Sequence, residues 1–237
     1  RPFSKVFATD YMCCSELAGR WLFGNKEYDK GNVYLLNNAI DLDKFKYDEE
    51  KRKEKRKELN IEDSTLVIGH VGRFVEQKNH RFLIDIFNEV HKQKENSILL
   101  LAGQGPLMKE MKEKVKILGI EDSVKFLGQR NDINELYQAM DLLLFPSLYE
   151  GLGMVVVEAQ ISGLPCVVST EIPEIAKVTK KIVFINLKNN IKTWTETIFN
   201  HLKNTNRKNT NFTDGLKNYD IKLETCKLEK NYLKKAK

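Results

Sequence analysis

The sequence predicts an α/β fold with a doubly wound parallel sheet. From residue 64 onward, short apolar runs alternate with longer stretches in which apolar residues recur three and four positions apart. The short runs are apolar on both faces, as strands are when helices cover both sides of a sheet. Right-handed crossovers between such strands make a Rossmann-like domain, whose ligands bind beyond the carboxyl ends of the strands.

This alternation places six strands and several helices. The expected strands span residues 66–71, 98–102, 124–127, 142–145, 166–169 and 182–185. The expected helices span residues 79–93, 107–118 and 131–140, and another begins near Gly153. Ligand contacts are therefore expected in the loops that follow the strands.

Composition divides the chain into three segments, residues 1–48, 49–202 and 203–237. The first segment shows two short strands, one of them at Lys5–Ala8, and a helix, which is too little for an independent core. Since the chain begins at Arg1 rather than Met, we expect a fragment that starts with the end of a preceding domain and its linker. The middle segment is the α/β domain, and the last is a polar loop with a helix at 219–235.

The middle segment opens with a run of mixed charges, residues 49–58, that predicts a solvated helix. The net charge of +6 lies in residues 200–237, where ten Lys and Arg face four Asp and Glu. The neutral main body gives no support to nucleic-acid binding, because phosphate affinity needs a basic surface. The basic tail could contact an anionic membrane surface or form a solvated helix.

Neither a membrane span nor a cysteine-based site is predicted. No apolar run approaches the ~20 residues that cross a bilayer, and the four cysteines show no C-x-x-C spacing. The four histidines form no obvious cluster. These features fit a cytoplasmic protein, which the basic tail could bring to the inner face of the membrane.

The first candidate ligand segment, Gly72–His80, directly follows an expected strand. Gly72 allows close approach of the backbone to a ligand. Arg73 and Lys78 could clamp a diphosphate, Arg73 as a bidentate fork and Lys78 as a point charge. The segment alone leaves open that both are ordinary surface charges.

Two further glycine-bearing segments follow strands. Gly103-Gln104-Gly105 lacks the third glycine of a dinucleotide fingerprint, because Met108 stands there, so it predicts a tight turn with Pro106 at the first helical position. After Gly128, the backbone of residues 129–130 is placed to bind the edge of a base, and Asp132 suits a helix N-cap.

The most informative segment is 146–160, in which a strand, a glycine-bearing loop and a helix follow one another. The free amides of a helix that begins near Gly153 form an anion site. Glu158, about 7–8 Å along that helix, stands among apolar residues and needs partners, which ribose hydroxyls would supply. Glu150 would face the sugar. The alternative is a Glu158 paired within the core and a Glu150 that is a simple loop charge.

Together these segments resemble family 4 of the glycosyltransferases, which have the GT-B fold. The matching motifs are Gly72-Arg73-x4-Lys78, the Gly103-x-Gly105 turn, Phe126-Leu127-Gly128-x-Arg130-x-Asp132 and Glu150-Gly-x-Gly-x4-Glu158-Ala. The resemblance covers roughly residues 5–200. It includes the interdomain strand and its turn at residues 35–41, where Asn38-Ala39 replaces the family's Asn-Gly. The variant of the paired-glutamate motif looks most like bacterial enzymes that build exopolysaccharide or capsule repeats.

The resemblance implies a role for each matching position. Arg73 and Lys78 would bind the donor diphosphate and stabilise the leaving group, Glu158 would bind the ribose, and Glu150 the hydroxyls of the donor sugar. The remaining implied donor contacts are made by Gly72, Gly128, Arg130, Gly153, Met154 and Val155, mostly through backbone groups. Gly128 and Arg130 would lie at the base, and Arg130 through its backbone rather than its side chain.

The resemblance also implies a reaction. A retaining glycosyltransferase would move a sugar from a nucleotide diphosphate-sugar, UDP favoured over GDP, to a glycan or lipid-linked acceptor without a metal. Its acceptor-binding N-terminal domain would be absent here, so we expect donor binding with little or no transfer. A GT-B epimerase or phosphorylase, or a non-catalytic nucleotide-sugar-binding module, remains an alternative.

Overall fold

The computed structural model describes residues 9–208, 210 and 212–235. The strand expected at Lys5–Ala8 lies outside the described residues. The chain divides into two units, one formed by Asp43–Thr213 and one by Arg1–Leu42 with Asp214–Lys237.

The larger unit contains a six-stranded parallel sheet with the order β5-β4-β3-β6-β7-β8. The strands are β3 (Leu66–Val71), β4 (Ser97–Ala102), β5 (Val124–Gly128), β6 (Leu142–Phe145), β7 (Cys166–Ser169) and β8 (Ile182–Ile185). All six predicted strands are thus confirmed to within one residue at each end. The apolar runs fix them, because a strand covered on both faces buries nearly every side chain.

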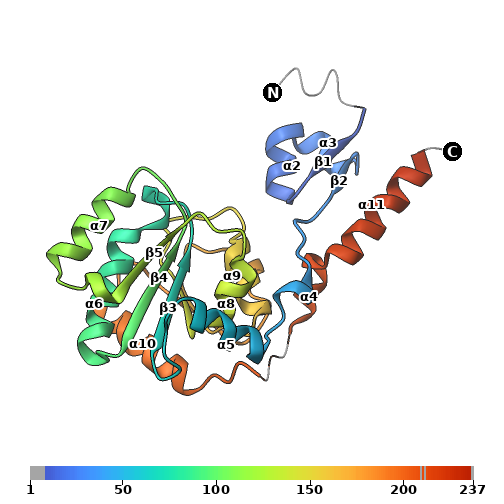
Figure 1. Ribbon diagram of the computed structural model, residues 1–237. Coiled ribbons are helices and arrows are strands. Elements are labelled where there is room, and N and C mark those ends of the chain that lie inside the picture. Colours follow the sequence, from blue (N-terminus) through green and yellow to red (C-terminus); the bar gives the residue numbers. More distant parts are fainter. Residues whose placement is uncertain (1–8, 209, 211, 236–237) are drawn as a thin grey trace. The chain divides into compact units, whose positions relative to one another are not determined.

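Helices cover both faces of this sheet (Figure 1). They are α5 (Glu49–Glu58), α6 (His80–Gln93), α7 (Met108–Ile117), α8 (Ile133–Ala139), α9 (Met154–Ile161) and α10 (Ile191–Lys203), with a 3-10 turn η1 (Glu76–Lys78). Helix α6 packs against α7 and α10, and α5 packs against α8. The predicted doubly wound α/β fold is confirmed.

The strand order places the topological switch point of the sheet between β3 and β6. After β3 the chain winds through β4 to β5, and it then returns to place β6 on the other side of β3. Ile68 pairs with Leu142 and Gly69 with Leu143. The loops after β3 and β6 therefore leave the sheet side by side, which is where ligands bind in open parallel sheets.

The main core lies between the sheet and the layer of α6 and α10. Leu83, Ile86, Phe87 and Val90 of α6 are fully buried there, together with Trp194 of α10. Their spacing of three and four positions is the period that predicted the helix. This packing anchors α6 directly after the candidate diphosphate loop.

Helix α5 is solvated over most of its surface, as its charges predict, but two of its cations are buried. Lys55 and Arg56 are buried, and Arg56 is only 1% exposed. Arg56 donates to the backbone oxygens of Ala139, Glu62, Asp63 and Thr65 and to the Asp141 carboxylate. The prediction fails at Arg56 because its acceptors, which include the Ala139 carbonyl at the end of α8, come from outside the helix. Burial lowers the pKa of Arg56, and Asp141 opposes that effect.

The polar segment after α10 forms a loop, as its composition predicted, and one of its side chains caps two helices. Arg207 donates to the backbone oxygens of Tyr137, Gln138 and Met140 at the end of α8 and of Ser162 after α9. Helix ends leave such carbonyls without partners. Arg207 therefore holds α8 and α9 at their carboxyl ends, which fixes the helices that carry part of the candidate site.

The smaller unit has a two-stranded parallel sheet, β1 (Tyr11–Cys13) and β2 (Val33–Leu35), with α2 (Glu16–Phe23) and α3 (Asn25–Asp29). It also contains η4 (Asp214–Tyr219) and α11 (Ile221–Lys235), which begins two residues after the predicted start. The short helix α4 (Leu42–Phe45) follows this unit's first segment. Among the described residues, no helix is both long and apolar enough to cross a membrane.

The buried guanidinium of Arg56 predicts a large loss of stability on substitution. Arg56→Met would leave the Asp141 carboxylate and several carbonyls without this donor, which should lower the free energy of unfolding by about 3–5 kcal/mol. The matched control Lys53→Met removes an exposed cation of the same helix, which pairs with the exposed Glu50, at a cost within about 0.5 kcal/mol. Urea unfolding followed by circular dichroism measures both, and equal losses would contradict the structural role of Arg56.

Candidate functional site

The loops after β3, β4 and β5 are joined backbone to backbone at the carboxyl edge of the sheet. The Gly103 amide donates to the Gly128 oxygen at 2.7 Å, and the Gly72 amide donates to Ala102 at 2.9 Å. A Cβ on Gly103, whose φ is +143°, would stand 2.0 Å from the Gly72 oxygen. A Cβ on Gly105 would stand 2.4 Å from the Phe74 oxygen. The two glycines of the Gly103-x-Gly105 turn thus permit close loop packing.

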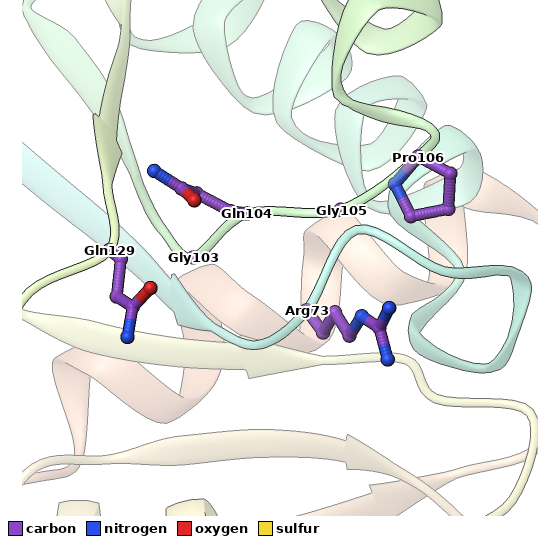
Figure 2. A pocket seen from close by; sticks show the side chains of 6 residues that line it. All are labelled: Arg73, Gly103, Gln104, Gly105, Pro106 and Gln129. Carbon is purple, nitrogen blue, oxygen red and sulfur yellow. The ribbon is translucent and has the colours of Figure 1, made fainter.

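A surface pocket of about 570 Å³ opens where these loops meet (Figure 2). Its lining residues are Arg73, Gly103, Gln104, Gly105, Pro106 and Gln129. Its volume lies within the range of small-molecule sites. Pro106 lies in the turn before α7, which begins at Met108, so the prediction that it occupies the first helical position was wrong. The Leu107 amide donates to the Phe74 oxygen, which holds the turn on the neighbouring loop.

Arg73 and Arg130, both predicted to lie at the ligand, have different surroundings. Arg73 is exposed and makes no ion pair among the described residues. The Arg130 side chain binds Asp132 through two nitrogens, at 2.7 and 2.6 Å, and Glu58 at 3.0 Å. Of these two arginines, Arg73 alone therefore has an exposed guanidinium without an ion-pair partner among the described residues.

Asp132 occupies the N-cap position of α8, but its carboxylate caps no amide. Instead it binds Arg130, and Lys55 at 2.8 Å. These hydrogen bonds hold the pKa of Asp132 well below its usual range, Arg130 contributing most. Glu58, Asp132 and Glu135 have a spacing that could hold a metal ion. However, the Lys55 ammonium binds all three carboxylates, so a cation of the chain itself already lies among them.

Lys78 and Glu150 meet directly across the β3–β6 junction. The Lys78 Nζ lies 2.5 Å from Glu150 Oε1, and the two side chains are only 15% and 9% exposed. The same ammonium lies over the ring of Phe145, 4.9 Å from its centroid. Gly72 lies beside this group, because a Cβ on it would stand 3.4 Å from the Lys78 side chain.

The backbone on either side of Lys78 is fastened to the loop that carries Glu150. The Leu148 amide donates to the Gln77 oxygen at 2.8 Å, and the Gln77 side-chain amide donates to the Tyr149 oxygen at 2.9 Å. The Asn79 side chain donates to the Pro146 oxygen at 3.1 Å. Asn79 also has a left-handed backbone (φ 55°), which Asn tolerates better than most residues. The two loops are therefore held as one surface.

Two histidines lie together beneath this loop, which corrects the expectation that the histidines form no cluster. The His70 and His80 rings are 4.7 Å apart, and they are flanked by stacked Phe145 and Phe74. Burial lowers the pKa of His70 well below its usual value and that of His80 to about 4. Both rings are therefore neutral near pH 7 and add no charge beside Lys78.

Helix α9 begins at Met154 after Gly153, whose left-handed backbone (φ 75°) forms the N-cap without a side-chain cap. The first helical hydrogen bonds run from Val156 and Val157 to the Gly153 oxygen. The amides of Gly153, Met154 and Val155 consequently come before the first amide that donates a hydrogen bond within the helix. They form, with the positive end of the helix dipole, a site suited to an anion.

Glu158, the fifth residue of α9, has a protein partner that the sequence did not reveal. The Tyr137 hydroxyl of α8 donates to Glu158 Oε2 at 2.9 Å. Burial raises the pKa of Glu158, and the Tyr137 hydrogen bond partly offsets this effect. One hydrogen bond leaves most of the acceptor capacity of a carboxylate unused, so Glu158 can still accept hydroxyl donors from a ligand.

Among the residues that the sequence missed, Tyr137, Gln77 and Asn79 support site groups rather than replace them. Tyr137 stands in the apolar stripe of a predicted helix, and a buried hydroxyl there requires an acceptor. That requirement was a usable signal. Gln77 and Asn79 bind carbonyls about seventy positions away, and the sequence carries no local sign of that pairing.

A parallel sheet with a glycine-lined pocket and an uncapped helix start at its carboxyl edge defines the class of α/β proteins in which ligand sites lie beyond the strands. The chain matches the model of the family "Glycosyl transferases group 1" over residues 51–217, and it belongs to this family.

Relatives of known sequence and structure agree with this assignment. The chain is 40% identical over 192 residues to "Putative glycosyltransferase EpsF" of Bacillus subtilis (strain 168), covering 81% of this chain and 50% of that protein. It is 31% identical over 144 residues to the UDP-Gal:alpha-D-GlcNAc-diphosphoundecaprenol alpha-1,3-galactosyltransferase of Escherichia coli, covering 60% and 37%. The chain thus spans half or less of the length of these relatives.

The fold is similar to that of a crystal structure of Anabaena Alr3699/HepE in complex with UDP and glucose. The TM-score is 0.79 at 21% identity, covering 98% of this chain and 65% of that one. This similarity confirms the Rossmann-like architecture of a GT-B glycosyltransferase.

The Tyr137–Glu158 hydrogen bond generates a prediction about the pKa of Glu158. Tyr137→Phe removes the donor and leaves burial unopposed, so the pKa of Glu158 should rise further above its usual value of 4.5. Because the folded-state pKa is raised, stability should fall as pH increases through it, and more steeply in the variant. A carbon-detected NMR titration of the Glu158 carboxyl measures the shift. Tyr149→Phe, which changes an exposed tyrosine, is the control, and an unchanged pKa in Tyr137→Phe would contradict the structure.

Proposed function

We propose that this chain is the donor-binding part of a retaining glycosyltransferase that uses a nucleotide diphosphate-sugar, with UDP favoured over GDP. The observation that carries the proposal is the convergence of charge at the β3–β6 junction. Lys78, Glu150 and the start of α9 lie on adjoining loops, and Arg73 borders the neighbouring pocket. Family membership supports sugar transfer, and the UDP named with two of the similar proteins supports the choice of base.

The proposed ligand spans these groups in order. The base lies in the pocket beside Gly103 and Gln129, against the backbone that follows Gly128. The diphosphate binds Arg73, Lys78 and the amides of Gly153, Met154 and Val155, which match its charge. The ribose hydroxyls donate to Glu158, and the sugar hydroxyls donate to Glu150.

The proposed reaction breaks the bond between the sugar anomeric carbon and the β-phosphate oxygen. The acceptor hydroxyl oxygen bonds to the same face of that carbon, and its proton passes to the departing phosphate. The two cations and the helix amides stabilise the negative charge that develops on the nucleoside diphosphate, which is electrostatic preorganisation. We propose that these groups replace a metal ion in that role.

The acceptor is proposed to be a glycan or lipid-linked sugar in bacterial polysaccharide synthesis, as suggested by the E. coli relative that acts on a diphosphoundecaprenol-linked sugar. Such an acceptor would place the protein at the cytoplasmic face of the membrane, where the basic tail could contribute to binding.

Titration of a panel of UDP- and GDP-sugars by calorimetry tests the proposed donor site. The wild type should bind one nucleotide class, and Glu158→Ala should weaken that binding at least tenfold, about 1.4 kcal/mol, because hydrogen bonds to a charged acceptor are lost. Glu196→Ala, on the exposed side of α10, is the matched control and should bind like wild type. No binding of either class would instead favour a non-enzymatic α/β module that has lost ligand binding.

The chain alone should bind donor but transfer little sugar, because an acceptor-binding half would be needed to complete the site. A radiolabelled UDP-sugar with a lipid-linked acceptor measures transfer. Full activity of the isolated chain would contradict this expectation.

A further inference from the structure

The two charged groups proposed to bind the donor at the β3–β6 junction are bound to each other. Lys78 and Glu150 form a close ion pair that is mostly removed from solvent. The Lys78 ammonium also lies over the Phe145 ring, which occupies a second side of the cation. A nucleoside diphosphate can therefore reach Lys78 only beside the Glu150 carboxylate, or by displacing it.

This arrangement makes Glu150 a competitor of the phosphates. Like charges at short range in a partly buried site repel strongly, because little water screens them. Glu150 cannot easily move away, since its loop is joined to the Lys78 segment through Leu148, Tyr149 and Pro146. The neutral His70–His80 pair beneath adds no cation that would offset the repulsion.

A sugar on the diphosphate changes this balance. Its hydroxyls are hydrogen-bond donors, and a carboxylate released from Lys78 is a strong acceptor for them. With the complete donor, Glu150 exchanges an ammonium for hydroxyls, and Lys78 exchanges a carboxylate for phosphate. With the bare nucleotide, Lys78 gains phosphate while Glu150 is left beside negative charge without a partner.

We propose that Glu150 is a specificity-determining residue that favours the sugar-bearing donor over the sugar-free nucleoside diphosphate by penalising the latter. When the sugar has been transferred, the unpartnered Glu150 carboxylate re-forms its ion pair with Lys78 and promotes release of the nucleotide product. This inference rests on the proposed function, because it concerns the same donor site.

Calorimetric titration of UDP and of a UDP-sugar against wild type and Glu150→Gln tests the inference. The amide keeps the shape of the side chain but removes the charge, so UDP should bind about three- to tenfold more tightly than to wild type. The UDP-sugar should bind equally or more weakly. The dissociation constant for UDP, divided by that for the UDP-sugar, should therefore fall. Glu150→Ala, which also removes the charge, should shift the ratio in the same direction.

The control is Glu76→Gln, which makes the same change of charge at an exposed residue on the neighbouring loop that carries Lys78, where Glu76 is paired with Arg81. It should leave the ratio unchanged, and thermal melting should show that all variants fold. If wild type binds UDP and both Glu150 variants bind it no more tightly, the inference is overturned and the proposed function stands. If wild type binds neither UDP nor the UDP-sugar, the proposed donor and this inference fail together.

Discussion

The parallel pairing of β3 with β6 is the constraint on which the candidate site depends. Because every strand of the sheet is parallel, the loops that follow the strands all leave at one edge. Because β3 and β6 are neighbours although they lie far apart in the sequence, the loop with Lys78 meets the loop with Glu150, which is 72 positions further along the chain. A sheet with a different strand order would separate these charges, whatever the sequence of each loop.

Most charged side chains at the carboxyl edge of the sheet already have partners within the protein. Arg130 and Asp132 neutralise each other, with Lys55 and Glu58 nearby, and Lys78 is matched by Glu150. Arg73 remains exposed, and Glu158 is held by a neutral hydroxyl. The charge that remains for a ligand is therefore positive around Arg73 and the start of α9, with an acceptor at Glu158. This distribution suits an anion that also carries hydroxyl groups.

The local sequence pattern was enough to predict the strands and helices. The burial of charged side chains and the contacts between distant residues depend on long-range pairing, which the local pattern does not indicate. The strands were predictable because burial on both faces leaves a run of apolar residues. Helix α5 was predictable in extent but not in burial, because its composition indicates solvation, while two of the acceptors that bind Arg56, Ala139 and Asp141, are more than eighty positions away. The adjacency of His70 and His80 depends on how a strand and the following helix fold back on one another, and their spacing of ten positions does not indicate it.

The candidate site was likewise predictable in part from local sequence and in part only from the folded structure. Lys78 and Glu150 could be proposed as neighbours from their place after strands, but the ion pair that joins them depends on the exact register of β3 and β6. Side chains that support the site, such as Tyr137 and Gln77, act through geometry that emerges only in the folded chain. The positions of the glycines were the most informative local signal, because Gly103 contacts Gly72 in a way that leaves no space for a Cβ.

A crystal structure of the chain with bound UDP would test the donor site most directly. The diphosphate oxygens should lie within hydrogen-bond distance of Lys78 and of the amides at the start of α9, with the ribose at Glu158. A diphosphate bound elsewhere on the surface, with the start of α9 free of it, would contradict a nucleotide-sugar site at the junction of β3 and β6.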